Sequence, residues 1–119
     1  MPGRWYAWGK FHDHWNIDLE PLEPNRWGWI VEVDPRNPDA MPIKHTALGR
    51  FRHEGAETCV SEDGKLVIYC GDDNRFDYQY KYVSNGTVTG DETFGSSLMS
   101  DGTLYVARFD EDGTITWLP

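Results

Sequence analysis

The sequence predicts an all-β fold built from antiparallel β-meanders, and three features of the chain lead to that prediction. Apolar and aromatic residues alternate with polar ones in short segments, which is the period of a strand. Asp-Gly pairs separate some of these segments, as they do in tight hairpin turns. No segment repeats apolar residues at the spacing of an amphipathic helix. The pattern alone fits a propeller and a sandwich equally well.

Each expected strand is bounded by residues that favour turns. Asp34-Pro35 ends the first strand, and Ser84-Asn85-Gly86 ends the most regular one, in which tyrosines alternate with polar residues. Asp63-Gly64 and Asp112-Gly113 lie inside two hairpin turns. The sequence signal is weakest for the second expected strand, residues 43–51. The expected strands cover residues 27–33, 43–51, 58–60, 66–70, 78–83, 103–109 and 114–117.

Two segments do not follow the strand pattern. Residues 1–26 are rich in Trp, Pro and charge, and we expect irregular structure that packs on something else. Residues 86–101 read as an exposed loop. We therefore treat residues 1–119 as a single domain, with the irregular aromatic segment first and the strands in residues 27–119.

The charge balance excludes some classes of partner. The chain has 11 Lys and Arg against 20 Asp and Glu, a formal charge of −9, whereas nucleic acids and anionic membranes bind positive surfaces. No apolar run approaches the roughly 20 residues that span a bilayer. The first residues lack the apolar stretch of a signal peptide. Cys59 and Cys70 are too few for a disulfide framework and are expected to be free thiols.

The aromatic content is high for so short a chain. Six Trp, six Tyr and five Phe need either a large core or a binding surface to cover them. One interpretation is a non-catalytic, aromatic-rich β-module that binds carbohydrate or another protein. The other is ordinary packing of the rings between layers of a larger fold. The tryptophans concerned are Trp5, Trp8, Trp15, Trp27 and Trp29.

Four blocks of sequence, in order, resemble the PhoX family of bacterial alkaline phosphatases. The second block contains Lys44-His45-Thr46 and Arg52-His53-Glu54 and is the most distinctive. Since four blocks in the family's order are far more specific than one, the resemblance extends over roughly residues 23–119. The blocks are residues 23–35; 42–56; 63–73 with 78–84; and 102–109 with 112–114 and 117–119.

The resemblance implies a β-propeller that hydrolyses phosphate monoesters with a central cluster of iron and calcium ions, in an exported, periplasmic or secreted enzyme. Intact members are several times longer, so this chain is expected to be a fragment of about one and a half to two blades. Further ligand segments of the family are expected outside it. The fragment is therefore expected to be inactive alone, and the sequence assigns no bound metal to it. We expect it to form homo-oligomers through its exposed strand edges.

Arg52 and Glu54 form the sharpest candidate site. In an extended segment they point to the same side, because side chains alternate with period two. A carboxylate is a good ligand for hard cations, and a planar guanidinium clamps phosphate at two points. The resemblance places the matching Arg and Glu at the family's cluster, so Arg52 is expected to bind substrate phosphate and Glu54 a metal. The alternative is a surface ion pair on an edge strand, with His53 packed on the other side.

The remaining candidates carry weaker signals. Asp73, in Gly71-Asp72-Asp73-Asn74, follows a strand and is a candidate metal ligand, although Asp and Asn also serve ordinary turns there. His12 and His14 form an H-x-H pair with irregular flanks, for which a packed or solvated role is expected. Neither a G-x-S-x-G elbow nor a phosphate-binding glycine loop occurs in the sequence.

Overall fold

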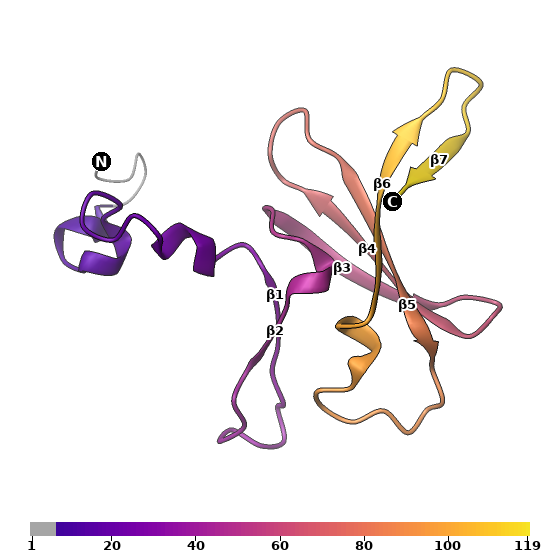
Figure 1. Ribbon diagram of the computed structural model, residues 1–119, viewed down its shortest axis with the longest axis horizontal. Helices are drawn as coiled ribbons and strands as arrows, with labels where there is room; N and C mark the ends of the chain where they lie inside the picture. The colour runs from indigo at the N-terminus through magenta and orange to yellow at the C-terminus, as the bar shows by residue number, and fades with distance from the viewer. Residues whose placement is uncertain (1–6) are drawn as a thin grey trace.

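The computed structural model describes residues 7–119 and has the predicted antiparallel all-β architecture, with no α-helix in that range (Figure 1). A two-stranded sheet pairs β1 (Ile30–Glu32) with β2 (Ile43–His45). A five-stranded meander follows, in the order β3-β4-β5-β6-β7. Its strands are β3 (His53–Val60), β4 (Lys65–Asp72), β5 (Gln79–Thr87), β6 (Gly102–Phe109) and β7 (Ile115–Leu118).

Five short 3-10 helices lie in the segments between the strands and before β1 of the described chain. Three of them lie in the segment predicted to be irregular, one follows β2, and one lies in the loop before β6. In Figure 1 the indigo N-terminal segment lies to one side of the meander, with the β1–β2 hairpin between them. The helices are η1 (Trp8–Lys10), η2 (Asp13–Trp15), η3 (Glu23–Arg26), η4 (Thr46–Leu48) and η5 (Ser97–Met99).

The second predicted strand is wrong in its extent. Strand β2 ends at His45, and η4 interrupts the segment expected to run to Phe51. Gly49 then takes φ +81°, a conformation that an extended strand does not contain. The physical reason is packing: η4 brings Leu48, which is 1% exposed, onto the face of the meander. Tertiary burial overrides local strand propensity here.

The core is a small cluster on one face of the meander. Leu48, Ile68, Cys70 and Tyr82 are buried together, and partly buried apolar residues such as Phe51 pack against them. Tyr82 donates a hydrogen bond of 2.8 Å from its phenol to the carbonyl of Leu98 in η5. Burial of Tyr82, aided by the charge of Asp101, raises the pKa of its phenol to about 12. Burial also raises the pKa of the Cys70 thiol, and both cysteines are free, as expected.

The chain is flat rather than compact. Its principal extents are 50 × 45 × 19 Å and its radius of gyration is 17.3 Å. A compact domain of this length has a radius of gyration of about 13.5 Å. Strand β3 is exposed on both faces beyond His53, and β3 and β7 form the two edges of the meander. The structure thus presents one packed face, one open face and two unpaired strand edges.

Candidate functional site

The structure brings Arg52 and Asp73 together. Arg52 immediately precedes β3, and its backbone carbonyl accepts a hydrogen bond of 2.8 Å from the N–H of Asp73, just after β4. A terminal guanidinium nitrogen of Arg52 lies 3.8 Å from Oδ2 of Asp73, and the two side chains are 67% and 63% exposed. An ion pair so exposed contributes at most about 1 kcal/mol to stability. Its consequence is positional: the backbone bond holds a guanidinium and a carboxylate side by side, both open to solvent.

Glu54 lies on β3 opposite a residue without a side chain. It pairs with Gly71 of β4, and a Cβ built on that glycine would lie 3.9 Å from the Cβ of Glu54. The register of β3 shifts between Glu54 and Glu57, and Gly55 inside this irregularity has φ +74°. Such bulges bend a strand and re-aim its side chains, commonly beside active sites. Glu54 is therefore an exposed carboxylate with open space across the ladder from it.

His53 is packed, in agreement with the role expected for it. Its ring stacks on Phe51 with 3.6 Å between centroids, and Phe51 in turn stacks on Tyr80. Since a carbonyl can only accept, Nε2 of His53 donates its hydrogen to the carbonyl oxygen of Gly49 over 3.1 Å. Nδ1 is buried without a hydrogen-bond partner in the structure. His53 thus anchors the start of β3 and fixes the position of its neighbour, Arg52.

The carboxylates near Arg52 do not by themselves form a metal site. Within residues 7–119, no group of three or more His, Cys, Asp and Glu side chains is arranged to hold a metal ion. Asp72 performs turn chemistry, because its Oδ1 accepts the backbone N–H of Asn74 at 3.0 Å. Glu54 and Asp73 are hard oxygen donors of the type that calcium and iron accept. The donor chemistry fits such ions, but the number of donors falls short.

A groove opens beside Arg52. It encloses about 630 Å³, within the size range of small-molecule sites. Four polar side chains contribute to its wall: Arg50, Arg52, Asp72 and Asn74. The remaining lining is largely apolar and comes from the N-terminal segment, the residues between η3 and β1, and the residue before Arg52. The apolar and ring-bearing residues that line it are His14, Trp15, Ile17, Pro24, Trp27 and Phe51.

Two tryptophans of the predicted aromatic surface stack in this groove. The ring centroids of Trp15 and Trp27 lie 4.8 Å apart, and their planes are inclined by 28°. His14 contacts Trp15 with tilted rings and His12 contacts His14, while both histidines remain exposed, which agrees with the packed or solvated role expected for the H-x-H pair. Trp29 points elsewhere, since its indole N–H donates to the carbonyl of Asn25. Trp5 lies outside the described residues. Of the predicted tryptophans, Trp15 and Trp27 are the two that line the groove among the described residues.

The structure also contains a buried polar junction of His45, Glu32 and Ser100 that no sequence motif predicts. Nε2 of His45 lies 2.8 Å from Oε2 of Glu32, and Nδ1 of His45 lies 3.0 Å from the hydroxyl of Ser100. The other carboxylate oxygen of Glu32 accepts the N–H of Gly95. His45 is 1% exposed, so its two polar contacts satisfy a ring that water does not reach. This junction ties the β1–β2 hairpin to the loop before β6. The partners are far apart in sequence, and no local signal marks them.

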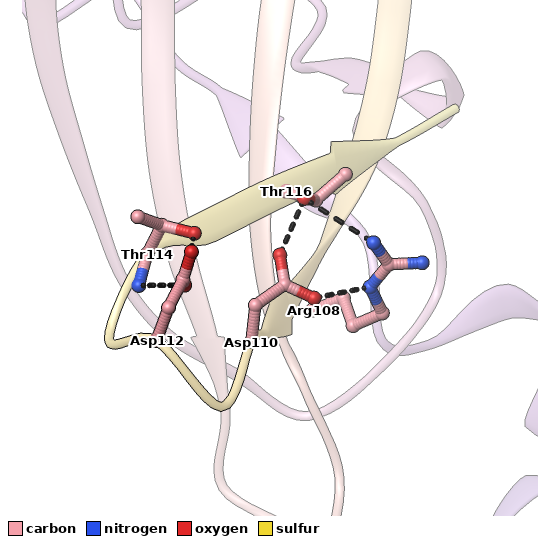
Figure 2. A network of polar contacts seen from close by, with 5 residues as sticks. All are labelled: Arg108, Asp110, Asp112, Thr114 and Thr116. Atoms are coloured by element: carbon pink, nitrogen blue, oxygen red, sulfur yellow. Dashed lines mark hydrogen bonds and ion pairs between the residues drawn. The ribbon is translucent and has the colours of Figure 1, made fainter.

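The acidic hairpin between β6 and β7 is a turn, as predicted (Figure 2). Asp110 accepts hydrogen bonds from the Thr116 hydroxyl and from Nε of Arg108, at 2.5 and 2.8 Å. These bonds lower the pKa of the Asp110 carboxyl. Asp112 accepts the N–H and the hydroxyl of Thr114, and the pKa of its carboxyl is lowered for the same reason. Both carboxylates are thus occupied within the hairpin, which explains their position without a cation.

Comparisons with known proteins agree on one family. The family described as Alkaline phosphatase PhoX matches residues 4–119. Among solved structures, the chain is similar to PhoX of Pseudomonas fluorescens, determined in complex with vanadate, a transition state analogue. The identity is 40% and the TM-score is 0.85, over 93% of this chain and 21% of that chain. The chain thus spans about a fifth of the length of the protein it matches. No curated protein matches it.

Proposed function

The chain belongs to the alkaline phosphatase PhoX family, and from that membership we propose that it forms part of a metal-dependent phosphatase that hydrolyses phosphate monoesters. The observation that carries the proposal is the position of Arg52. Its exposed guanidinium lines a groove beside the carboxylate of Asp73, whose backbone N–H is hydrogen-bonded to the carbonyl of Arg52. A phosphate ester needs such a group at the point where negative charge develops.

In this proposal Arg52 binds the phosphate of the substrate. A guanidinium presents planar, paired N–H donors that match two phosphate oxygens at once, and it stays charged at any relevant pH. The N–H of Phe51 donates to the carbonyl of Gly28 on one side of Arg52, and the N–H of Asp73 donates to the carbonyl of Arg52 itself, so the backbone is held on both sides of the guanidinium. Because the backbone is held before substrate arrives, binding has to order only the exposed side chain of Arg52.

We further propose that Glu54 and Asp73 donate two ligands to a metal cluster of iron and calcium. Both carboxylates are exposed and close to the backbone of Arg52, and both have the hard oxygen donors these ions accept. Other ligands would have to come from outside residues 7–119. Bound metal supplies Lewis acidity that polarises a phosphoryl group. A ligand set of two explains why we expect this chain to be inactive by itself.

The place of action follows from the same family. Alkaline phosphatases of this kind typically act outside the cytoplasm, and we propose a periplasmic or secreted location for the enzyme to which this chain contributes. In the described part of the chain, no helix has the length and apolar character needed to cross a membrane.

The experiment places the chain in a complete enzyme. Residues 7–119 replace the matching fifth of the Pseudomonas fluorescens protein, and phosphatase activity of the chimera is measured with iron and calcium present. Arg52→Gln should lower kcat/KM by about 100-fold or more, since it removes a charged donor from the developing oxyanion. Arg75→Gln, at another exposed arginine, is the matched control and should change little. Full activity of the Arg52 variant would show that the phosphate binds elsewhere.

A further inference from the structure

We propose that the groove beside Arg52 holds the leaving group of the phosphate monoester and favours a planar aromatic one, which stacks on the Trp15–Trp27 pair. The inference rests on the proposed function, because Arg52 must hold the phosphate end. It names the class of substrate that the same site prefers: aryl phosphates over alkyl phosphates.

The two stacked rings in the groove leave apolar surface open to a ligand. Trp15 and Trp27 stack on each other, yet they remain 41% and 48% exposed. Large rings bury well over 100 Å² each when they are packed, so half-exposed stacked indoles leave much apolar area uncovered. An aromatic group placed against the exposed part of Trp27 would extend the stack. A ligand with a short alkyl or polyol group would cover less of this area and gain no ring contact.

The groove is formed before any ligand binds. The guanidinium of Arg50 donates to the carbonyl of Pro24 at 3.2 Å, and the N–H of Phe51 donates to the carbonyl of Gly28 at 3.1 Å. Gly28 has φ +85°, and an added Cβ would lie 3.2 Å from the carbonyl oxygen of Phe51. These contacts lock the segment that carries Trp27 against the segment that carries Arg52. The distance between the aromatic end and the phosphate end is therefore fixed by the backbone.

The charges in the groove suit an ester whose anionic group lies at one end only. Arg50 and Arg52 supply positive charge to the wall, and Asp72 supplies a negative one. Trp15, Trp27 and Phe51 supply uncharged rings. A phosphate dianion is attracted to the arginines, while its aromatic leaving group is drawn to the apolar wall. An aryl phosphate has this division of charge and apolar surface.

The test uses NMR on the ¹⁵N-labelled chain, in which protein signals near each end of the ligand are observed during a titration. The probe is 2-naphthyl phosphate and the comparator is glycerol 3-phosphate, each titrated to millimolar concentration. The indole N–H signals of Trp15 and Trp27 report the aromatic end, and the guanidinium Nε–H of Arg52 reports the phosphate end. Trp27→Leu keeps apolar volume but removes the stacking ring, and Trp15→Leu repeats the test at the other ring. Trp117→Leu is the control, because Trp117 lies in β7 and contacts Lys81.

We expect naphthyl phosphate to shift all three signals and glycerol phosphate to shift that of Arg52 alone. Trp27→Leu should weaken naphthyl phosphate binding roughly three- to tenfold, the usual effect of one aromatic contact, while Trp117→Leu leaves it unchanged. If both ligands shift Arg52 equally and neither shifts the indoles, the aromatic preference is wrong and the role of Arg52 stands. Indole shifts without any shift of Arg52 overturn the proposal of one continuous site. If no signal moves, both proposals fail.

Discussion

The ionisation of Tyr82 offers a quantitative test of the packing that supports the site. This phenol is 1% exposed, and its pKa is raised to about 12, whereas a phenol in the unfolded chain titrates near 10. Below pH 10 the phenol is neutral in both states, and its contribution to stability is fully present. Between pH 10 and 12 only the unfolded state ionises, so stability falls as pH rises. A shift of about two units corresponds to a loss of roughly 2–3 kcal/mol.

Chemical denaturation with urea measures this loss. The free energy of unfolding is determined at pH 9 and at pH 11.5 for the natural chain and for Tyr82→Phe. The Phe variant lacks the 2.8 Å hydrogen bond to Leu98, so it should be about 1 kcal/mol less stable at pH 9. Its stability should then fall less with pH than that of the natural chain. The difference between the two slopes isolates Tyr82 from the other tyrosines, including Tyr80, whose phenol pKa is also raised by burial.

Equal pH slopes for the two proteins would refute the reasoning. They would mean that Tyr82 is reached by water or ionises as easily in the folded state as in the unfolded state.

Three further predictions follow from the structure. Gly102→Ala should destabilise the chain by about 1–3 kcal/mol, because a Cβ there would lie 2.4 Å from the carbonyl oxygen of Val83. Thermal unfolding measures this loss. Gly113→Ala is the control: its Cβ would meet no other atom, so only the strain of φ +85° remains and the loss of stability should be smaller. Asp110→Asn should reduce the loss of stability that the natural chain shows as pH falls through the lowered pKa of Asp110, because only the contribution of this carboxyl is removed; urea midpoints at pH 3 and 6 measure the reduction, and an unchanged loss would contradict it. Lastly, the unpaired edges of β3 and β7 should make the isolated chain self-associate. In sedimentation velocity, the average sedimentation coefficient should rise with protein concentration. A monomer at every concentration would contradict this prediction.

Much of the sheet could be predicted because its signals are local. The alternation of Tyr80 and Tyr82 with polar neighbours identified β5, since period two is a property of one strand. The Asp-Gly pairs at residues 63–64 and 112–113 located two hairpins, because both glycines need positive φ. Turn chemistry and side-chain alternation are decided by a few adjacent residues, and the sequence displays them directly.

The contacts that build the site could not be predicted in the same way. The sequence singled out Arg52 and Asp73 separately, but their proximity depends on the pairing of β3 with β4 and on a backbone bond just beyond it. The stacking of Trp15 on Trp27 depends on how an irregular segment folds back, for which no periodic signal exists. The end of β2 at His45 was missed because the burial of Leu48 decides it.

A crystal structure of the chimeric enzyme with vanadate would test the central claim most directly. We predict that the guanidinium of Arg52 donates two hydrogen bonds of about 2.7–2.9 Å to vanadate oxygens, with Glu54 and Asp73 bound to metal ions next to it. Vanadate held by other residues, with Arg52 turned to solvent and both carboxylates distant from any metal, would contradict the account.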